Sequence, residues 1–289
     1  GTESSFWDIY SVVEENTASP KTTLYAKWAD EAAPVLGEAS FGTGSRSFMD
    51  WVVGRKKLTI SVPVIEEGSG LKQGDYSLEP EKGQAKQGTA TVRMYQRWTK
   101  AVRARSGGVA AIMTVRGDDA GGQYTVVVTI DEDFKGSVFL TCSDNAGNTS
   151  VRKTLTADGA GAVVEDNAPE IRFSKAASSA VMADKTEADA ASRNKLQAKA
   201  TINVDVSDSA GEQVTAGLAS VSYQLDGGKV QAVGEGEFTD SMVEDYSFAM
   251  DIEGEGKHSL QVTAADNAGN ETTRKAMIEI SKRRATVVP

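Results

Sequence analysis

The chain has 289 residues, and its 31 Lys and Arg against 41 Asp and Glu leave a net charge of −10 at pH 7. An acidic chain of this kind is not a general binder of nucleic acids or of anionic membranes. Glycine is frequent, at 28 residues, which suits short strands joined by turns, and a single cysteine excludes a disulfide within the chain. The length allows two domains with full hydrophobic cores.

Residues 1–30 differ from the rest of the chain. They end in an alternating strand, Thr23–Trp28, which follows Pro20. This ending, Thr-Leu-Tyr-Ala-Lys-Trp, preceded by Trp7-Asp8 and a short loop, resembles the close of a Listeria–Bacteroides repeat, the internalin B-type β-grasp module. The resemblance implies that residues 1–30 are the C-terminal part of such a repeat, which occurs in surface and secreted proteins of bacteria.

Two short segments with Ala-Pro in front of an apolar strand mark the start of two domains. Residues 31–36 read Glu-Ala-Ala-Pro-Val-Leu, and residues 166–171 read Asp-Asn-Ala-Pro-Glu-Ile. Proline cannot donate to a strand ladder, so it is tolerated at strand starts and edges, where modules commonly join. We therefore predict one domain over 31–165 and a second over 166–282, followed by a linker at 283–289.

One stretch occurs twice, 122 residues apart. Ser137–Arg152 reads SVFLTCSDNAGNTSVR, and Ser259–Arg274 reads SLQVTAADNAGNETTR. In each copy an alternating strand leads into Asp-Asn-Ala-Gly-Asn, where Asx side chains bond their own backbone and glycine supplies a positive φ. The pattern predicts a β-hairpin in each domain, with Cys142 and Ala264 on the core side of matching strands.

The repeat extends beyond the hairpin, and its offset changes within the first copy. Gly70-Leu71 matches Gly217-Leu218 at an offset of 147, whereas Tyr124–Ile130 matches Tyr246–Ile252 at 122. The difference of 25 residues locates an insertion in the first copy, at about residues 79–123. Each copy then holds about seven short strands, as in an immunoglobulin-like sandwich. We predict an all-β fold with two immunoglobulin-like β-sandwiches in tandem after the partial β-grasp repeat.

The insertion carries a local excess of positive charge. From Lys82 to Gly117 there are eight Lys and Arg and no Asp or Glu, with two aromatic residues between them. Such a surface can recognise anionic glycans, teichoic acid or an acidic protein face. Alternatively, the basic side chains belong to added strands and protect a sheet edge. The candidate ligand-binding residues are Arg93, Tyr95, Arg97, Trp98, Lys100, Arg103 and Arg105.

Residues for catalysis are scarce. His258 is the only histidine, no nucleophile-elbow sequence accompanies it, and one His with one Cys cannot supply the usual zinc ligands. We interpret His258 as an exposed residue at the start of a strand. The chain is therefore predicted to be no enzyme, with no catalytic residues.

Calcium is the one cofactor that the sequence leaves open. Calcium binds clusters of oxygen ligands, and the candidates in the two hairpins and at the domain junction are Asp144, Asn145, Asp166, Asn167, Asp266 and Asn267. Similar Asp-Asn-Ala-Gly-Asn loops recur in bacterial Ig-like repeats, and the resemblance implies calcium at module junctions as one alternative. The other is that these side chains only close turns. Without a dense Asp-x-Asp-x-Asp loop, we expect no dedicated metal site.

The hairpins and the partial repeat together resemble multi-domain surface proteins of Gram-positive bacteria. The resemblance implies a non-enzymatic, extracellular stalk or adhesive module, cell-surface or secreted, which is monomeric, binds no nucleic acid and does not insert into a membrane. Two alternatives stay open. The basic insertion could bind a carbohydrate or an anionic polymer of the host or the cell wall, or the segment could be an accessory part of a large secreted glycan-acting enzyme.

Overall fold

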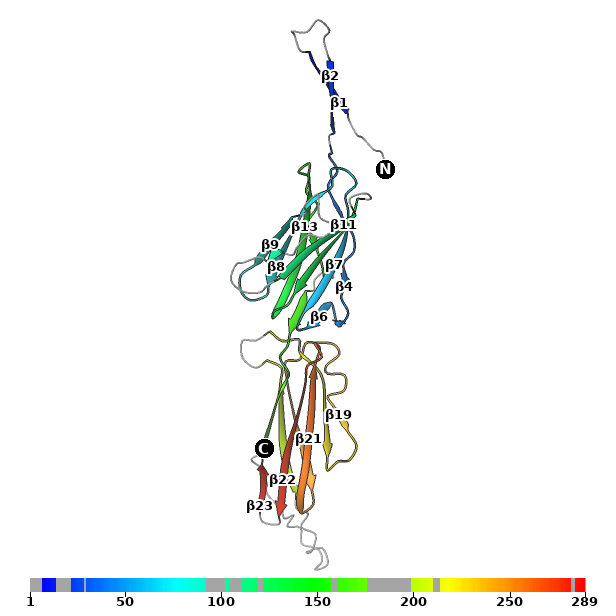
Figure 1. Ribbon diagram of the computed structural model, residues 1–289. Coiled ribbons are helices and arrows are strands. Elements are labelled where there is room, and N and C mark those ends of the chain that lie inside the picture. Colours follow the sequence, from blue (N-terminus) through cyan, green and yellow to red (C-terminus); the bar gives the residue numbers. More distant parts are fainter. Residues whose placement is uncertain are drawn as a thin grey trace, which may run out of the picture. The chain divides into compact units, whose positions relative to one another are not determined.

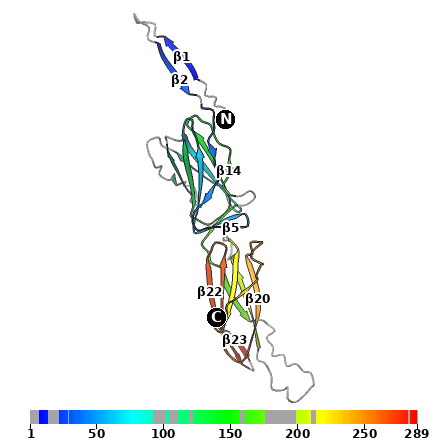
Figure 2. The ribbon, with the colours of Figure 1, turned by 90° about the vertical axis from the view of Figure 1, so that its right-hand side faces the viewer.

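The computed structural model describes residues 7–13, 22–28, 30–91, 102–103, 111–118, 122–156, 161–175, 199–209, 214–281 and 284–288. Within these residues every regular element is a β-strand (Figure 1; Figure 2). The predicted all-β class is therefore confirmed. The described residues contain no helix of the length and hydropathy needed to cross a bilayer.

The chain divides into two compact units. The first consists of Gly1–Gly42, Thr59–Ile130 and Ser137–Leu155, and the second of Thr43–Leu58, Asp131–Gly136 and Thr156–Pro289. These borders follow spatial contacts and not the sequence repeat, so segments of the first repeat belong to the second unit. The domain borders inferred from the repeat remain predictions.

The first unit begins with an antiparallel hairpin of β1 (Trp7–Val13) and β2 (Thr22–Trp28), in which Trp7 lies opposite Trp28. The strand predicted at Thr23–Trp28 is thus present. A six-stranded sheet follows. Its strands are β10 (Val102–Arg103), β11 (Ala111–Asp118), β12 (Gln123–Ile130), β7 (Leu58–Ile65) and β3 (Val35–Leu36), in this order, with β4 (Ser40–Phe41) also on β7.

A seven-stranded sheet contains the repeated hairpin strand. Its order is β5 (Ser45–Phe48), β6 (Trp51–Arg55), β15 (Ala162–Glu165), β13 (Phe134–Asp144), β8 (Leu71–Pro80) and β9 (Lys86–Thr91), and β14 (Lys153–Thr154) pairs with β13. Alternate side chains of β13 are buried, as expected for a strand with one face on a core. Cys142 is one of them and is fully buried, which confirms its predicted core position.

The first unit thus has a sandwich-like core between strands of two sheets. Every second residue of β7 from Leu58 to Val64 is buried, and so is every second residue of β12 from Tyr124 to Ile130. This period of two is typical of strands with one face on a core. The insertion also contributes an added strand, β11, which pairs with β12.

The second unit repeats the arrangement with two further sheets. One has the order β16 (Glu170–Lys175), β17 (Lys199–Ser207) and β20 (Asp245–Glu253). The other has the order β19 (Gln231–Val233), β18 (Leu218–Leu225), β21 (Gly256–Asp266), β22 (Glu271–Ser281) and β23 (Arg284–Val288). Ile171, Ile202, Leu260 and Ile278 belong to one buried cluster that includes Ala264, at the position matching Cys142.

Candidate metal centres

The two repeated hairpins place an aspartate at the end of a long strand. Asp144 ends β13, and its Oδ1 accepts hydrogen bonds from the backbone N–H groups of Gly147 (2.7 Å) and Asn148 (2.8 Å). Asp266 ends β21 and makes the equivalent bonds at 2.6 and 2.8 Å. Gly147 and Gly269 have φ values of 101° and 90°. The predicted turn chemistry is therefore present in both copies.

Each of these aspartates also belongs to a group of three carboxylates. In the first cluster, one oxygen each of Asp30, Glu66 and Asp144 lie within 4.8 Å of one another, and in the second the same is true of Glu165, Asp208 and Asp266. All members of the first cluster belong to the first unit, and all members of the second cluster to the second unit. Sequence analysis identified only the hairpin member of each cluster.

The two clusters are built from equivalent positions. Each takes one carboxylate from the residue directly before an Ala-Pro segment (31–36 or 166–171), one from the residue directly after a long core strand, and one from the hairpin. The core strands are β7 and β17. Three stretches of chain that are distant in sequence therefore meet at the same place in both repeats.

The second cluster is almost completely buried. Glu165, Asp208 and Asp266 are 1%, 5% and 0% exposed. The Thr215 hydroxyl and the Gly217 N–H donate to Oδ2 of Asp208, at 2.5 and 2.8 Å. Among the described residues, no Lys or Arg forms an ion pair with any of the three carboxylates. No described side chain therefore balances their negative charge.

Burial of unbalanced carboxylates has the expected effect on their proton affinity. The pKa of Glu165 is raised to about 8, chiefly by burial and also by the charge of Asp266, against the N–H of Asn167, which lowers it. Burial likewise raises the pKa of Asp208 to about 6. Three carboxylates this close cannot all stay ionised out of water unless protons or a cation compensate them.

Asn270 adds a second observation at this cluster. Its side chain is 1% exposed, and Nδ2 donates to Oε1 of Glu165 (3.1 Å) and to Oδ2 of Asp266 (2.9 Å). Its Oδ1 is buried without a partner among the described residues. Rotation of the Asn270 side-chain amide by 180° would exchange the positions of Nδ2 and Oδ1. Oδ1 would then face the carboxylates and could be the fourth oxygen ligand of a cation.

The first cluster has the same plan but is more open on one side. Glu66 and Asp144 are buried, whereas Asp30 is half-buried. Burial and the charges of Asp30 and Asp144 raise the pKa of Glu66. Burial would also raise the pKa of Asp30, but hydrogen bonds from the N–H groups of Ser69 (2.6 Å) and Ala32 (3.1 Å) keep that pKa below its ordinary value.

The asparagines that follow the hairpin aspartates have another role. Nδ2 of Asn145 donates to the carbonyl of Gly70 at 2.9 Å, and Nδ2 of Asn267 donates to that of Gly217 at 3.0 Å. Both side chains therefore attach the hairpin to the loop before the neighbouring strand.

The candidates at the domain junction also have other partners. Asp166 forms ion pairs with Arg55 (3.6 Å) and Lys56 (3.2 Å). Nδ2 of Asn167 donates to Asp133 at 3.3 Å, and its backbone N–H donates to Glu165. Asn167 thus contributes a backbone donor to the second cluster.

Sequence analysis missed four of the six carboxylates, Asp30, Glu66, Glu165 and Asp208. One signal was available, because an acidic residue stands directly before both Ala-Pro segments. The acidic residue after each core strand was harder to match, since Glu in one copy corresponds to Asp in the other and the loops that follow differ in length.

The remaining predicted site residues lie in the basic insertion. Arg93, Tyr95, Arg97, Trp98, Lys100 and Arg105 lie outside the described residues, and Arg103 lies in β10 without a described side chain. The ligand-binding surface proposed for them stays a prediction.

His258 differs from its prediction. It lies near the start of β21, but its side chain is only 15% exposed, and its Nδ1 lies 2.8 Å from Oδ2 of Asp226. The expectation of an exposed histidine is therefore wrong. The carboxylate comes from the turn after β18, a partner that the local sequence does not reveal.

Comparison with known proteins assigns neither a family nor a function to the chain. No protein-family model matches the chain, and none of the curated proteins matches it. The interpretation of the site therefore depends on its geometry.

Proposed function

We propose that the chain is a non-enzymatic segment of a bacterial cell-surface protein, a stalk or adhesive module, in which each of two immunoglobulin-like modules binds a calcium ion at its carboxylate cluster. The observation that supports this is the duplication of the cluster at equivalent positions of both repeats. Both repeats keep a carboxylate at each of the three positions, although Asp and Glu replace each other at two of them.

The dimensions of the clusters suit calcium. Calcium–oxygen distances are about 2.3–2.6 Å, so two ligands of one ion lie at most about 5 Å apart. The oxygens of each cluster are within 4.8 Å of one another. Carboxylate and amide oxygens are the ligands that this ion prefers, and extracellular modules bind it with dissociation constants of about 0.1–1 mM.

The origin of the three carboxylates explains what the ion would do. It would connect the residue before each Ala-Pro segment to the end of a core strand and to the hairpin. That link would stiffen the point at which the chain begins each module. A stalk has to resist bending at such points, whereas the fold of each sandwich is already stabilised by its apolar core.

Thermal melting of the full chain in millimolar calcium and in EDTA tests the proposal. Binding to the native state alone raises the melting temperature, so we expect a higher value in calcium. Asp208→Asn with Glu66→Gln should abolish most of the difference. Glu253→Gln changes an exposed acid at the end of β20 and should leave it intact. Equal melting temperatures of the native chain in calcium and EDTA would refute the proposal.

A further inference from the structure

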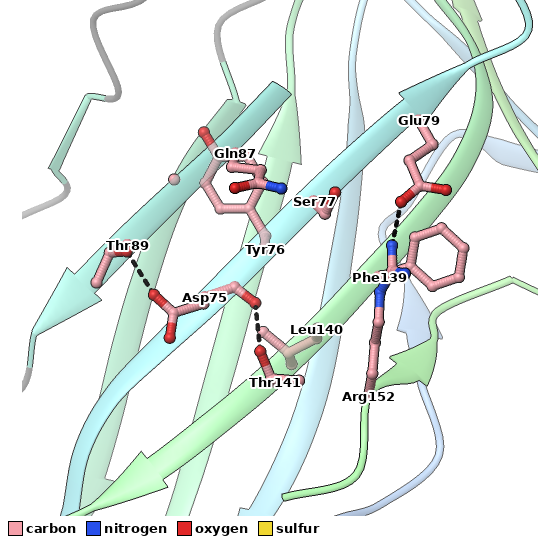
Figure 3. A pocket seen from close by; sticks show the side chains of 11 residues that line it. Asp75, Tyr76, Ser77, Glu79, Gln87, Thr89, Phe139, Leu140, Thr141 and Arg152 are labelled. Carbon is pink, nitrogen blue, oxygen red and sulfur yellow. Dashed lines mark hydrogen bonds and ion pairs between the residues drawn. The ribbon is translucent and has the colours of Figure 1, made fainter. Parts of the chain in front are cut away.

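The first unit has a hollow beside its strands β8, β9 and β13. It has a volume of about 380 Å³ and is lined by residues of β8, β9 and β13 and by Arg152 (Figure 3). Small-molecule pockets commonly measure about 300–1,000 Å³. None of the carboxylate-cluster residues lines the hollow, so it is a separate feature of the molecule.

Strand alternation determines which side chains face the hollow. On β8 the buried Tyr76 and Leu78 alternate with Asp75, Ser77 and Glu79, which are half-buried. Because successive side chains of a strand point to opposite faces, these three polar residues lie on one side of the sheet. The neighbouring strands add polar residues there as well, since Gln87 of β9 pairs with Ser77 and Thr89 with Asp75.

On one side of the hollow, the side chain of Arg152 is fixed by a cation–π contact and an ion pair. The guanidinium of Arg152 lies over the ring of Phe139, 3.7 Å from its centroid, and forms an ion pair with Glu79 (Figure 3). Contacts of this kind orient a long side chain that would otherwise sample many rotamers. The donors of Arg152 and the second oxygen of Glu79 are therefore held in position before any ligand arrives.

The opposite wall is held by hydrogen bonds to a carboxylate. Asp75 accepts hydrogen bonds from the Thr89 hydroxyl and, at 2.9 Å, from Nε2 of Gln73. The Thr141 hydroxyl donates to the backbone carbonyl of Asp75 at 3.4 Å. Figure 3 shows Asp75, Thr89 and Thr141 grouped on this side of the hollow.

Between the two walls lies a hydroxyl without a partner. Oγ of Ser77 is buried and makes no hydrogen bond with any described residue. Buried polar groups in folded proteins nearly always have a partner, and an exception requires an explanation. A ligand group that donates to or accepts from this hydroxyl would supply the missing bond.

The chemistry of the lining selects the ligand class. Carboxylates accept, the guanidinium donates, and amide and hydroxyl groups do both, so a ligand rich in hydroxyl groups can be satisfied here. Two carboxylates against one guanidinium leave the hollow with one negative charge, which disfavours an anionic polymer. We infer that this hollow binds an uncharged saccharide unit, a hexose or N-acetylhexosamine, of a glycan.

The second repeat shows that the fold does not require these residues. The core positions Tyr76 and Leu78 correspond to Tyr223 and Leu225. The residues that line the hollow are not kept in the second repeat. Asp75, Ser77 and Phe139 correspond there to Ser222, Gln224 and Gln261. The second repeat therefore provides a control that has the same fold without the residues of the hollow.

The test uses the full chain, fluorescently labelled, on an array of immobilised trisaccharides of glucose, galactose and N-acetylglucosamine, followed by calorimetric titration with the soluble form of the best binder. Ser77→Ala should weaken binding about tenfold, as expected for loss of one ligand hydrogen bond, without lowering the melting temperature. Gln87→Ala, at an exposed position, should weaken it similarly, whereas Gln261→Ala in the second repeat should not. An absence of binding to every uncharged glycan, or equal affinities of Ser77→Ala and the unchanged chain, would overturn the inference.

Discussion

Asn270 donates to Asp266 from both its backbone and its side chain. The backbone N–H bonds Oδ1 at 2.8 Å, and Nδ2 bonds Oδ2 at 2.9 Å. Asn148 and Asp144 make the same pair of bonds, both at 2.8 Å. In each hairpin, one oxygen of the aspartate accepts the backbone N–H groups of the loop, and the other oxygen accepts the side-chain amide of the asparagine. The same aspartate is also a member of a carboxylate cluster.

Asp266→Ala should lower the stability of the second unit by about 2–3 kcal/mol. It removes the acceptor of two backbone N–H groups and one of the two acceptors of the Asn270 amide, which keeps only its bond to Glu165. Urea unfolding, followed in the second unit, measures the effect. Asp240→Ala, at an exposed position, should change stability by less than about 0.5 kcal/mol, and an equal loss in both variants would contradict the prediction.

Without calcium, the second unit should become less stable as the pH rises from about 5 to about 8. The pKa of Glu165 is about 8 in the folded chain against an ordinary value of 4.5, and that of Asp208 is about 6 against 3.8. Between these values the folded state holds protons that the unfolded state has released, so a rising pH favours unfolding. Melting temperatures in EDTA across this range measure the trend.

Glu165→Gln is the control for the pH dependence. The amide keeps the size of the side chain and cannot ionise, so the fall in melting temperature between pH 5 and pH 8 should be smaller. The same variant should lose part of the calcium effect, because the ion requires ionised ligands. A variant with an unchanged pH profile would show that another group is responsible.

Cys142 should be inert toward thiol reagents in the folded chain. It is fully buried, and burial, together with the negative charge of Asp75, raises its pKa to about 12. A thiol in this state provides almost no thiolate at neutral pH, and the thiolate is the reactive form. An aromatic disulfide reagent should therefore react at pH 8 only after urea is added, and rapid reaction of the native chain would count against this assignment.

Gly147→Ala should destabilise the first hairpin by about 1–2 kcal/mol. The glycine has a φ of 101°, and an added Cβ would meet no atom within 4 Å, so the cost is backbone strain alone. Gly147→Asn should cost less, since asparagine tolerates positive φ better. Melting temperatures of the two variants measure the difference, and equal losses would point to a cause other than backbone conformation.

Much of the fold follows from local pattern. Alternation of apolar residues predicted the hairpin strand β13, and Asp-Asn-Ala-Gly-Asn predicted the two hairpins with their positive-φ glycines. These features depend on residues close together in sequence, so that a single strand or turn carries the signal. The position of Cys142 in the core followed from the same alternation.

The partners of buried polar groups could not be predicted in this way. Glu66 and Asp208 look like ordinary loop acids after a strand, and His258 looks like an exposed residue. Their environments depend on segments many residues away. These side chains become buried only when the distant segments pack against them, and burial then raises the pKa of Glu66 and of Asp208.

The sequence by itself determined the all-β class, the repeat and the turn chemistry, because strand period and turn residues act over a few neighbouring positions. Only the tertiary structure decided that Asp144 and Asp266 each meet two further carboxylates, and that Ser77 lies without a partner in a hollow of the sheet. Both depend on the approach of strands that are distant in the chain. The repeated aspartate is therefore both a turn residue and the shared member of two candidate metal centres.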